Sequence, residues 1–222
     1  MIETMIKMWD RYGFVYLQGL TGTLCLAAIT VFFGTLIGMI LAIMRLSRVK
    51  PFQWFVRFYI WVLRGTPILL QLYFFWIFLP RVLPVKISDS SCIIIIALII
   101  NASSYVAEVI RAGIQAVDKG QTEAARSLGM TGSHTMTQII LPQAIKNILP
   151  ALGNEFITMI KQASLASVFF INELTTSYKT ISSATFRPVE ALMIAGIIYL
   201  MVTTVLGKIM EYAEWRMNRN ER

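Results

Sequence analysis

The sequence predicts an all-α, polytopic membrane protein with five transmembrane helices and a helical coupling loop in the cytoplasm. Of the 222 residues, 56% are hydrophobic and only 14% are charged, and the mean hydropathy is +0.65. This composition is too apolar for a soluble domain, whose surface must be hydrated. Long apolar runs alternate with short polar segments, apart from one long polar stretch at residues 111–150. We therefore expect a single transmembrane domain with spans at about residues 19–44, 52–79, 91–110, 151–171 and 189–210.

The first predicted span, residues 19–44, is long enough to cross a hydrocarbon core of about 30 Å with some tilt. It follows an amphipathic lead-in at residues 1–18. Gly34, Gly38 and Ala42 recur every four residues, and small residues at this spacing let a neighbouring membrane helix approach closely. Helix packing alone is a sufficient explanation of this pattern.

The second predicted span, residues 52–79, contains Arg64 followed by Gly, Thr and Pro67. Pro67 cannot donate a hydrogen bond to Leu63, so we expect the helix to kink or restart there. A charge inside a span needs a protein partner or water. Two explanations of Arg64 stay open: it pairs with Glu108 of the third span, or it extends to the cytoplasmic interface.

The third predicted span, residues 91–110, begins with aliphatic residues and then becomes polar. Asn101, Tyr105 and Glu108 share one helix face, which we expect to point into the bundle. Arg111 follows Glu108 by three residues and can pair with it on the helix surface. The polar face is either part of a substrate path or a set of hydrogen bonds between helices without a ligand.

The fourth predicted span, residues 151–171, has a polar face made of Asn154, Thr158 and Lys161. The ammonium of Lys161 lies near the centre of the span and is a candidate for binding an anionic group in a substrate path, the alternative being a salt bridge to Glu155 or to an acid from another helix. Hydroxyl and amide side chains surround Lys161, which favours the first explanation. The predicted substrate path consists of Asn101, Tyr105, Thr158, Lys161 and Gln162.

Charge distribution sets the expected orientation. Residues 172–187 are polar and predict an external loop before the last span, so five spans place the termini on opposite sides. With the N-terminus outside, the inner edges of the spans carry twice as many Lys and Arg residues as the outer edges, as the positive-inside rule requires. Residues 111–150 and the C-terminus then lie in the cytoplasm. Membrane topology accounts for the net charge of +8, and we expect no nucleic-acid partner.

Residues suited to catalysis or metal binding are lacking in the sequence. His134, the only histidine, lies in the polar loop, and no carboxylate pair or cluster of metal ligands accompanies it. Cys25 and Cys92 lie in apolar runs without partners at metal-ligand spacing, which predicts buried free thiols. We expect no catalytic residue, no metal and no cofactor bound by this chain.

The polar loop contains a spaced motif, and two other stretches accompany it. The motif consists of Glu123, Ala124, Ala125, Gly129, Ile139, Leu141 and Pro142. It resembles the cytoplasmic loop of the membrane (permease) subunits of bacterial ATP-binding-cassette importers. Residues 64–67 with Gln71, and residues 107–121, resemble the polar amino acid uptake branch of that family. Three ordered motifs are a specific signal, whereas a lone Glu-Ala-Ala would be weak.

The resemblance implies a multi-pass translocation subunit in the bacterial plasma (inner) membrane that works by alternating access for polar amino acids. It implies a second permease subunit, identical or related, two cytoplasmic ATPase subunits, an external solute-binding protein and surrounding membrane lipid. Glu123 would contact a basic residue of the ATPase, and Gly129 would permit a turn in the loop. The chain has no Gly-rich phosphate loop, so ATP and Mg are expected in the partner subunits.

The resemblance also bears on the cargo. Several family members carry an acid directly after the lysine equivalent to Lys161, and that acid is associated with basic substrates. This chain has Gln162 there, so we expect a neutral or amide-bearing amino acid. Another small polar solute, such as an amino acid derivative or a sulfur-containing one, is an alternative. A proton-coupled secondary transporter is a further alternative, because it too would carry Arg64, Glu108 and Lys161 inside spans, but it would not need the Glu-Ala-Ala loop.

Overall fold

Apolar runs and prolines determine where the helices begin and end. The computed structural model describes residues 1–82 and 90–218, of which 91% are helical and none is in a strand. The elements are α1 (Ile2–Leu46), α2 (Lys50–Gly65), α3 (Ile68–Val82), α4 (Ser90–Gln115), α5 (Lys119–Ser127), α6 (Gly132–Thr135), the π-helix η1 (Met136–Ile140), α7 (Leu141–Gln162), the 3-10 helix η2 (Ala163–Phe169), α8 (Leu174–Thr185) and α9 (Pro188–Asn218).

Several of these helices have the length and composition of membrane spans. In the described ranges, α1, α4 and α9 can each cross a membrane, and α2 with α3 meets the same test as a pair bent by 110°. The prediction of an all-helical fold with several apolar helices is confirmed. The number of five spans stays a prediction, because α7 is not among the helices that meet this test of length and apolar composition in the described ranges.

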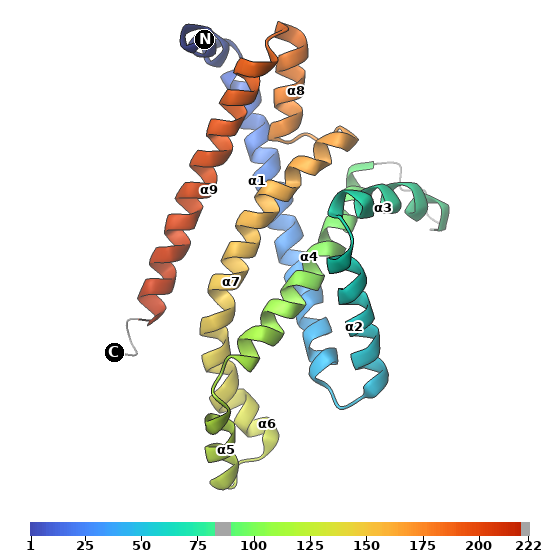
Figure 1. The fold of residues 1–222 in the computed structure, drawn as a ribbon, viewed down its shortest axis with the longest axis vertical. Coiled ribbons are helices and arrows are strands. Elements are labelled where there is room, and N and C mark those ends of the chain that lie inside the picture. The colour runs from blue at the N-terminus through green and yellow to red at the C-terminus, as the bar shows by residue number, and fades with distance from the viewer. Residues whose placement is uncertain (83–89, 219–222) are drawn as a thin grey trace.

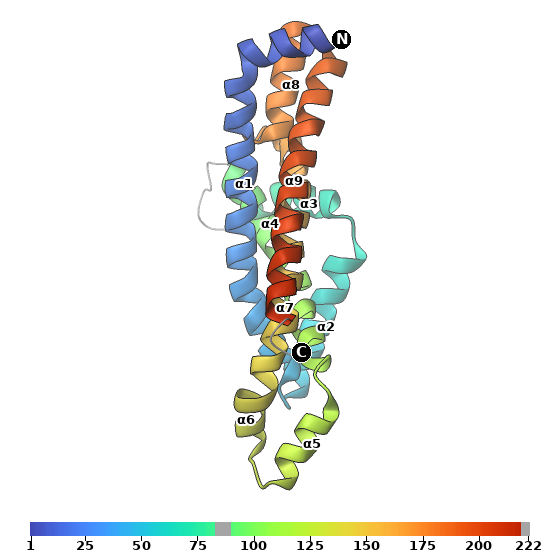
Figure 2. The same cartoon turned by 90° about the vertical axis from the view of Figure 1, so that its left-hand side faces the viewer.

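The helices form an elongated bundle (Figure 1). In this view α1, α4 and α7 run through its middle, with α9 on one side and α2 on the other. The short helices α5 and α6 extend beyond the bundle at one end, and α8 lies at the opposite end beside the start of α9. Figure 2 shows the first turns of α1 lying across that second end before the helix turns along the bundle.

Close packing of α1 on α4 follows from small residues. A Cβ atom added at Gly34 would lie 2.9 Å from the Cβ of Ala102. A Cβ added at Gly38 would lie 2.7 Å from Val106 Cγ1 and 3.1 Å from the backbone nitrogen of Ala107. The spacing of small residues therefore does bring a neighbouring helix close, and the neighbour is α4.

We expect Gly38→Val to destabilise the fold by about 1–3 kcal/mol, because overpacking would push α1 away from the backbone of α4. The measurement is the thermal midpoint of the protein purified in detergent. Gly196→Val is the matched control, since nothing lies within 4 Å of a Cβ built at Gly196. Equal midpoints for the two variants would show that this contact does not limit stability.

The start of the chain is not a separate lead-in, because α1 runs without a break from Ile2 to Leu46. Met8 and Tyr16 are buried against Leu174 and Ile181 of α8. The Tyr16 hydroxyl also donates to the carbonyl of Ala191 at 3.0 Å. These contacts with distant segments, which sequence pattern does not reveal, hold the first turns of α1 on the bundle.

The predicted external loop at residues 172–187 is instead largely the helix α8, so that prediction was wrong. Glu173 caps the helix by accepting hydrogen bonds from the backbone nitrogens of Thr175 at 2.8 Å and Thr176 at 2.6 Å. Leu174 and Ile181 lie seven residues apart on its buried face. The high Ser and Thr content concealed this weak amphipathic pattern.

The cysteine prediction was also wrong in part. Cys25 and Cys92 are both free thiols, as expected, but both are exposed in the single chain. Apolar runs in a membrane protein have outer faces as well as buried ones, so an apolar neighbourhood in sequence does not imply burial within the chain.

Candidate functional site

A polar junction connects α2 to α3. Pro67 has no N–H group and cannot donate to the Leu63 carbonyl four residues earlier. The Gln71 side chain supplies the missing donor, with Nε2 2.7 Å from Leu63 O and 2.8 Å from Thr66 Oγ1. Gln71 Oε1 in turn accepts from Asn101 Nδ2 at 2.8 Å. This amide fixes the bend between α2 and α3 and connects it to α4.

Three arginines surround the single carboxylate of Glu108 on α4. Arg45, from the end of α1, places Nη1 2.6 Å from Glu108 Oε2. Arg111, one turn along α4, donates to Glu108 Oε1 from both Nε and Nη2. Arg64, at the end of α2, lies farther away, with Nη1 4.0 Å from Oε1. We call these four residues the Glu108 cluster; it connects α1, α2 and α4 and carries an excess of positive charge.

Arg64 is the most exposed member of the Glu108 cluster. Its side chain is 42% exposed, against 21% for Glu108. Its guanidinium lies 5.2 Å from the centre of the Tyr105 ring, a cation–π distance. Arg64 therefore connects the end of α2 to two side chains of α4, Glu108 and Tyr105. Glu155 of α7 is buried, and its Oε1 has no hydrogen-bond partner in the described part of the chain.

The predicted polar face of α7 is open on one side. Lys161 is exposed and forms no ion pair, with Glu155 or any other acid, in the described residues. Thr158 directs its hydroxyl at the carbonyl of Asn154, 3.0 Å away. Gln162 Oε1 is buried and unpartnered among those residues. An unpaired ammonium beside an unsatisfied amide is able to bind a polar ligand.

The five residues predicted for the substrate path fall into two groups in the structure. Two of them lie on α4 and the other three lie on α7. Asn101 is 2% exposed and bonded to Gln71, and Tyr105 stacks on Arg64. Thr158, Lys161 and Gln162 lie together at the end of α7. For Asn101, the hydrogen bond between helices is the explanation that the geometry favours.

The polar loop forms a hairpin of short helices. Asp118 caps α5 by accepting from the nitrogen of Gly120 at 2.6 Å. Within α5, Ala125 is buried, whereas Glu123 and Ala124 are exposed. Gly129 follows with a φ of 81°, a conformation that favours glycine. The chain can therefore reverse direction sharply after α5.

The second half of the hairpin joins α7 without a gap. Pro142, near the start of α7, leaves the carbonyl of Gln138 without its usual helical donor, and a π-helix precedes it. Ile140 and Ala144 are buried in a small core with Val117, which fixes the hairpin to the bundle. Its exposed tip includes Leu128, which is 84% exposed, and lies beyond the other helices (Figure 1).

Comparison with known families decides what this arrangement is. Residues 34–217 match the family model described as "binding-protein-dependent transport system inner membrane component". The chain belongs to this family. Together with the relatives and the solved structure described next, this match confirms a permease subunit of the amino acid uptake type and its place among multi-pass inner membrane proteins.

Named relatives cover the permease almost from end to end. It is 38% identical to the arginine transport system permease protein ArtQ of Bacillus subtilis, over 92% of this chain and 93% of the relative. It is 36% identical to the putative glutamine transport system permease protein GlnP of Rickettsia conorii, over 98% of this chain and 99% of the relative.

Solved structures agree with the fold of the permease. A crystal structure described as an amino acid ABC transporter with histidines matches with a TM-score of 0.89 and 44% identity, covering 93% of this chain and 96% of that chain. An inward-facing structure of the MetNI methionine ABC transporter matches with a TM-score of 0.79 over 93% of this chain and 97% of that chain. At 15% identity, the latter supports the fold alone.

Sequence reasoning missed two members of the permease's polar interior. Arg45 is one of the basic residues that the charge count places at the inner edges of the spans, and that count gave it no partner, yet it makes a short hydrogen bond to Glu108. Gln71 was noted only as part of a motif, although it satisfies the backbone at Pro67. The missing donor at Pro67 was a usable signal for Gln71, whereas nothing local to Arg45 indicates its partner 63 residues away.

Proposed function

We propose that this chain is the translocation subunit of an ATP-driven importer of polar amino acids. The observation that carries the proposal is the hairpin of α5 and α6, which presents Glu123 on an exposed surface beyond the end of the bundle. Cytoplasmic ATPase subunits would dock there and bind the ATP and Mg, while a second permease subunit would complete the membrane domain. An external solute-binding protein would deliver the cargo at the end formed by α8 and the start of α1.

The proposed topology has five spans, namely α1, the bent pair α2 and α3, α4, α7 and α9. The N-terminus lies outside and the hairpin lies in the cytoplasm. Support comes from the basic residues at the α1–α2 connection, the hairpin and the end of α9, which the positive-inside rule places in the cytoplasm. Figure 1 shows the hairpin and the α1–α2 connection toward the same end of the molecule. ATP-driven closure of the ATPase subunits would then act directly on α4 and α7.

The cargo would bind at the C-terminal end of α7, where Lys161 and Gln162 lie. The unpaired ammonium of Lys161 suits the carboxylate of an amino acid, and the amide of Gln162 suits a neutral side chain. The names of relatives include both arginine and glutamine, so they do not decide between a basic and a neutral cargo. Gln162 favours the neutral one, because an amide cannot neutralise a cation in a membrane interior.

We expect glutamine and other neutral polar amino acids to stimulate ATP hydrolysis by the reconstituted importer more strongly than arginine or lysine. The measurement is ATPase activity of the full complex with its binding protein, across a panel that also includes amino acid derivatives. Stimulation by arginine alone would contradict the assigned cargo. Uptake that survives ATP depletion and stops when the proton gradient is removed would contradict the importer mechanism itself.

A further inference from the structure

An exposed row of cations and aromatic rings runs along α2. Lys50, Trp54, Arg57 and Trp61 follow one another at spacings of four, three and four residues, which places them on one helix face. The two tryptophans are 76% and 71% exposed. Phe58, beside them, is 57% exposed. We call these five residues the α2 stripe; the opposite face of α2 packs on α1 and α4.

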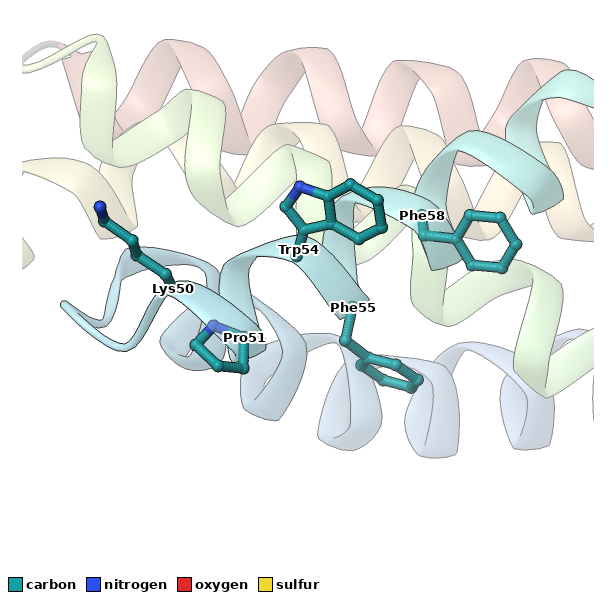
Figure 3. Close-up of a pocket in the computed structure, with 5 residues that line it drawn as sticks. All are labelled: Lys50, Pro51, Trp54, Phe55 and Phe58. Carbon is teal, nitrogen blue, oxygen red and sulfur yellow. The ribbon is translucent and has the colours of Figure 1, made fainter.

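Two adjoining hollows lie along the α2 stripe. The larger, of about 680 Å³, is lined by Lys50, Pro51, Trp54, Phe55 and Phe58 (Figure 3). The smaller, of about 240 Å³, is lined by Trp54, Arg57, Phe58 and Trp61. Because Trp54 and Phe58 line both, the two hollows form one continuous apolar surface. Figure 3 shows Lys50 at one end of the larger hollow and the rings of Trp54 and Phe58 further along α2.

The cations on this surface have no anionic partner in the part of the chain that the structure describes. Lys50 and Arg57, together with Arg48 just before α2, are exposed and form no ion pair within the described ranges. Arg45, three residues before Arg48, shows the contrast, because it bonds to Glu108. Free cations next to an aromatic surface match a ligand with a negative head and an apolar body.

We propose that the α2 stripe binds an anionic phospholipid. The phosphate lies between Lys50 and Arg57, and an acyl chain covers Trp54, Phe58 and Trp61. Seven residues separate the two cations, about 10 Å along the helix axis, and both side chains are long enough to converge on one headgroup. The inference rests on the proposed orientation, which places the start of α2 at the cytoplasmic surface, where aromatic and basic residues of a span meet lipid headgroups.

Charge decides between lipid classes. A phosphatidylglycerol headgroup carries a net negative charge, so both cations attract it. A phosphatidylcholine headgroup adds a quaternary ammonium that Lys50 and Arg57 repel. Near a membrane surface each basic residue strengthens anionic lipid binding about fivefold. Selectivity for the anionic lipid is therefore the property to measure.

The test uses the full-length chain, purified in neutral detergent and mixed with equal amounts of phosphatidylglycerol and phosphatidylcholine. Bound lipid is counted by native mass spectrometry. We expect the unaltered chain to retain phosphatidylglycerol preferentially and the double variant Lys50→Gln/Arg57→Gln to lower that preference roughly tenfold or more. The exchanged variant Lys50→Arg/Arg57→Lys, which keeps both charges, should retain it.

The matched control is Lys208→Gln/Arg216→Gln, which removes the same charge from exposed positions on α9. Equal losses in both double variants would mean general electrostatic attraction and would overturn the proposal, as would undiminished selectivity in the α2 variant. A shift of the α2 variant from dimer to monomer would assign this face to a second copy of the chain. These outcomes are independent of ATP hydrolysis, so failure of the cargo experiment would leave the lipid result intact.

Discussion

Glu123→Lys is expected to lower ligand-dependent uptake by the assembled importer at least about tenfold. Glu123 is exposed on α5 and makes no hydrogen bond or ion pair within the described residues, so the permease itself should fold as before. If the docking surface of the ATPase is basic, the substitution replaces an attraction with a like-charge contact, which costs several kcal/mol at an interface. The measurements are uptake into vesicles and ligand-stimulated ATPase activity of the complex.

Glu211→Lys serves as the control for this charge reversal. Glu211 is exposed near the end of α9, so the same change in charge is made on the proposed cytoplasmic side but away from the hairpin. Uptake should be close to normal in this variant. Normal assembly, uptake and ATPase stimulation in Glu123→Lys would remove the docking role from Glu123.

Local chemistry made some features of the fold predictable. The missing N–H of Pro67 predicted the break between α2 and α3, and the structure has it at that residue. The spacing of Gly34 and Gly38 predicted a close helix contact, which α4 makes. In each case the signal is contained in a few neighbouring residues, so no knowledge of distant segments is needed.

Features that depend on distant contacts were not predictable. The capping of α8 by Glu173 also involves Tyr199, whose hydroxyl donates to Glu173 Oε2 at 3.0 Å from the adjacent helix α9. The stretch Glu173-Leu-Thr-Thr-Ser looks like a polar loop until that packing is known. The position of Arg64 in its span indicated the ion pair with Glu108, which the structure has at 4.0 Å, but it did not reveal Arg45, which lies closer at 2.6 Å.

In the candidate site, too, local sequence signals were predictive and contacts between distant segments were not. Lys161 was a candidate for an unpaired ammonium because hydroxyl and amide side chains surround it in the sequence, and the structure leaves it unpaired in the described residues. Asn101 was grouped with Tyr105 and Glu108 by periodicity alone. Periodicity gives the face of a helix but not the neighbouring side chain, and for Asn101 that neighbour is Gln71.

Glu108→Gln is expected to lower the stability of the permease by about 2 kcal/mol or more, because removing one partner of a shielded charge cluster leaves the others uncompensated. Three guanidiniums would face one another without a carboxylate, and α1, α2 and α4 would lose their shared contact. For a chain of this size the thermal midpoint should fall by about 4–8 °C. The midpoint is measured on the permease purified in detergent.

Two further variants separate the charge effect from a general loss of hydrogen bonds. Arg45→Gln should cost less than Glu108→Gln, since Glu108 keeps Arg111 as a partner and the excess positive charge decreases. Glu190→Gln, which breaks the more exposed pair with Arg187 at 3.5 Å, should change the midpoint little. If Arg45→Gln destabilises as much as Glu108→Gln, the cluster acts through individual hydrogen bonds. The ordering expected here requires instead that Glu108 acts by neutralising several arginines at once.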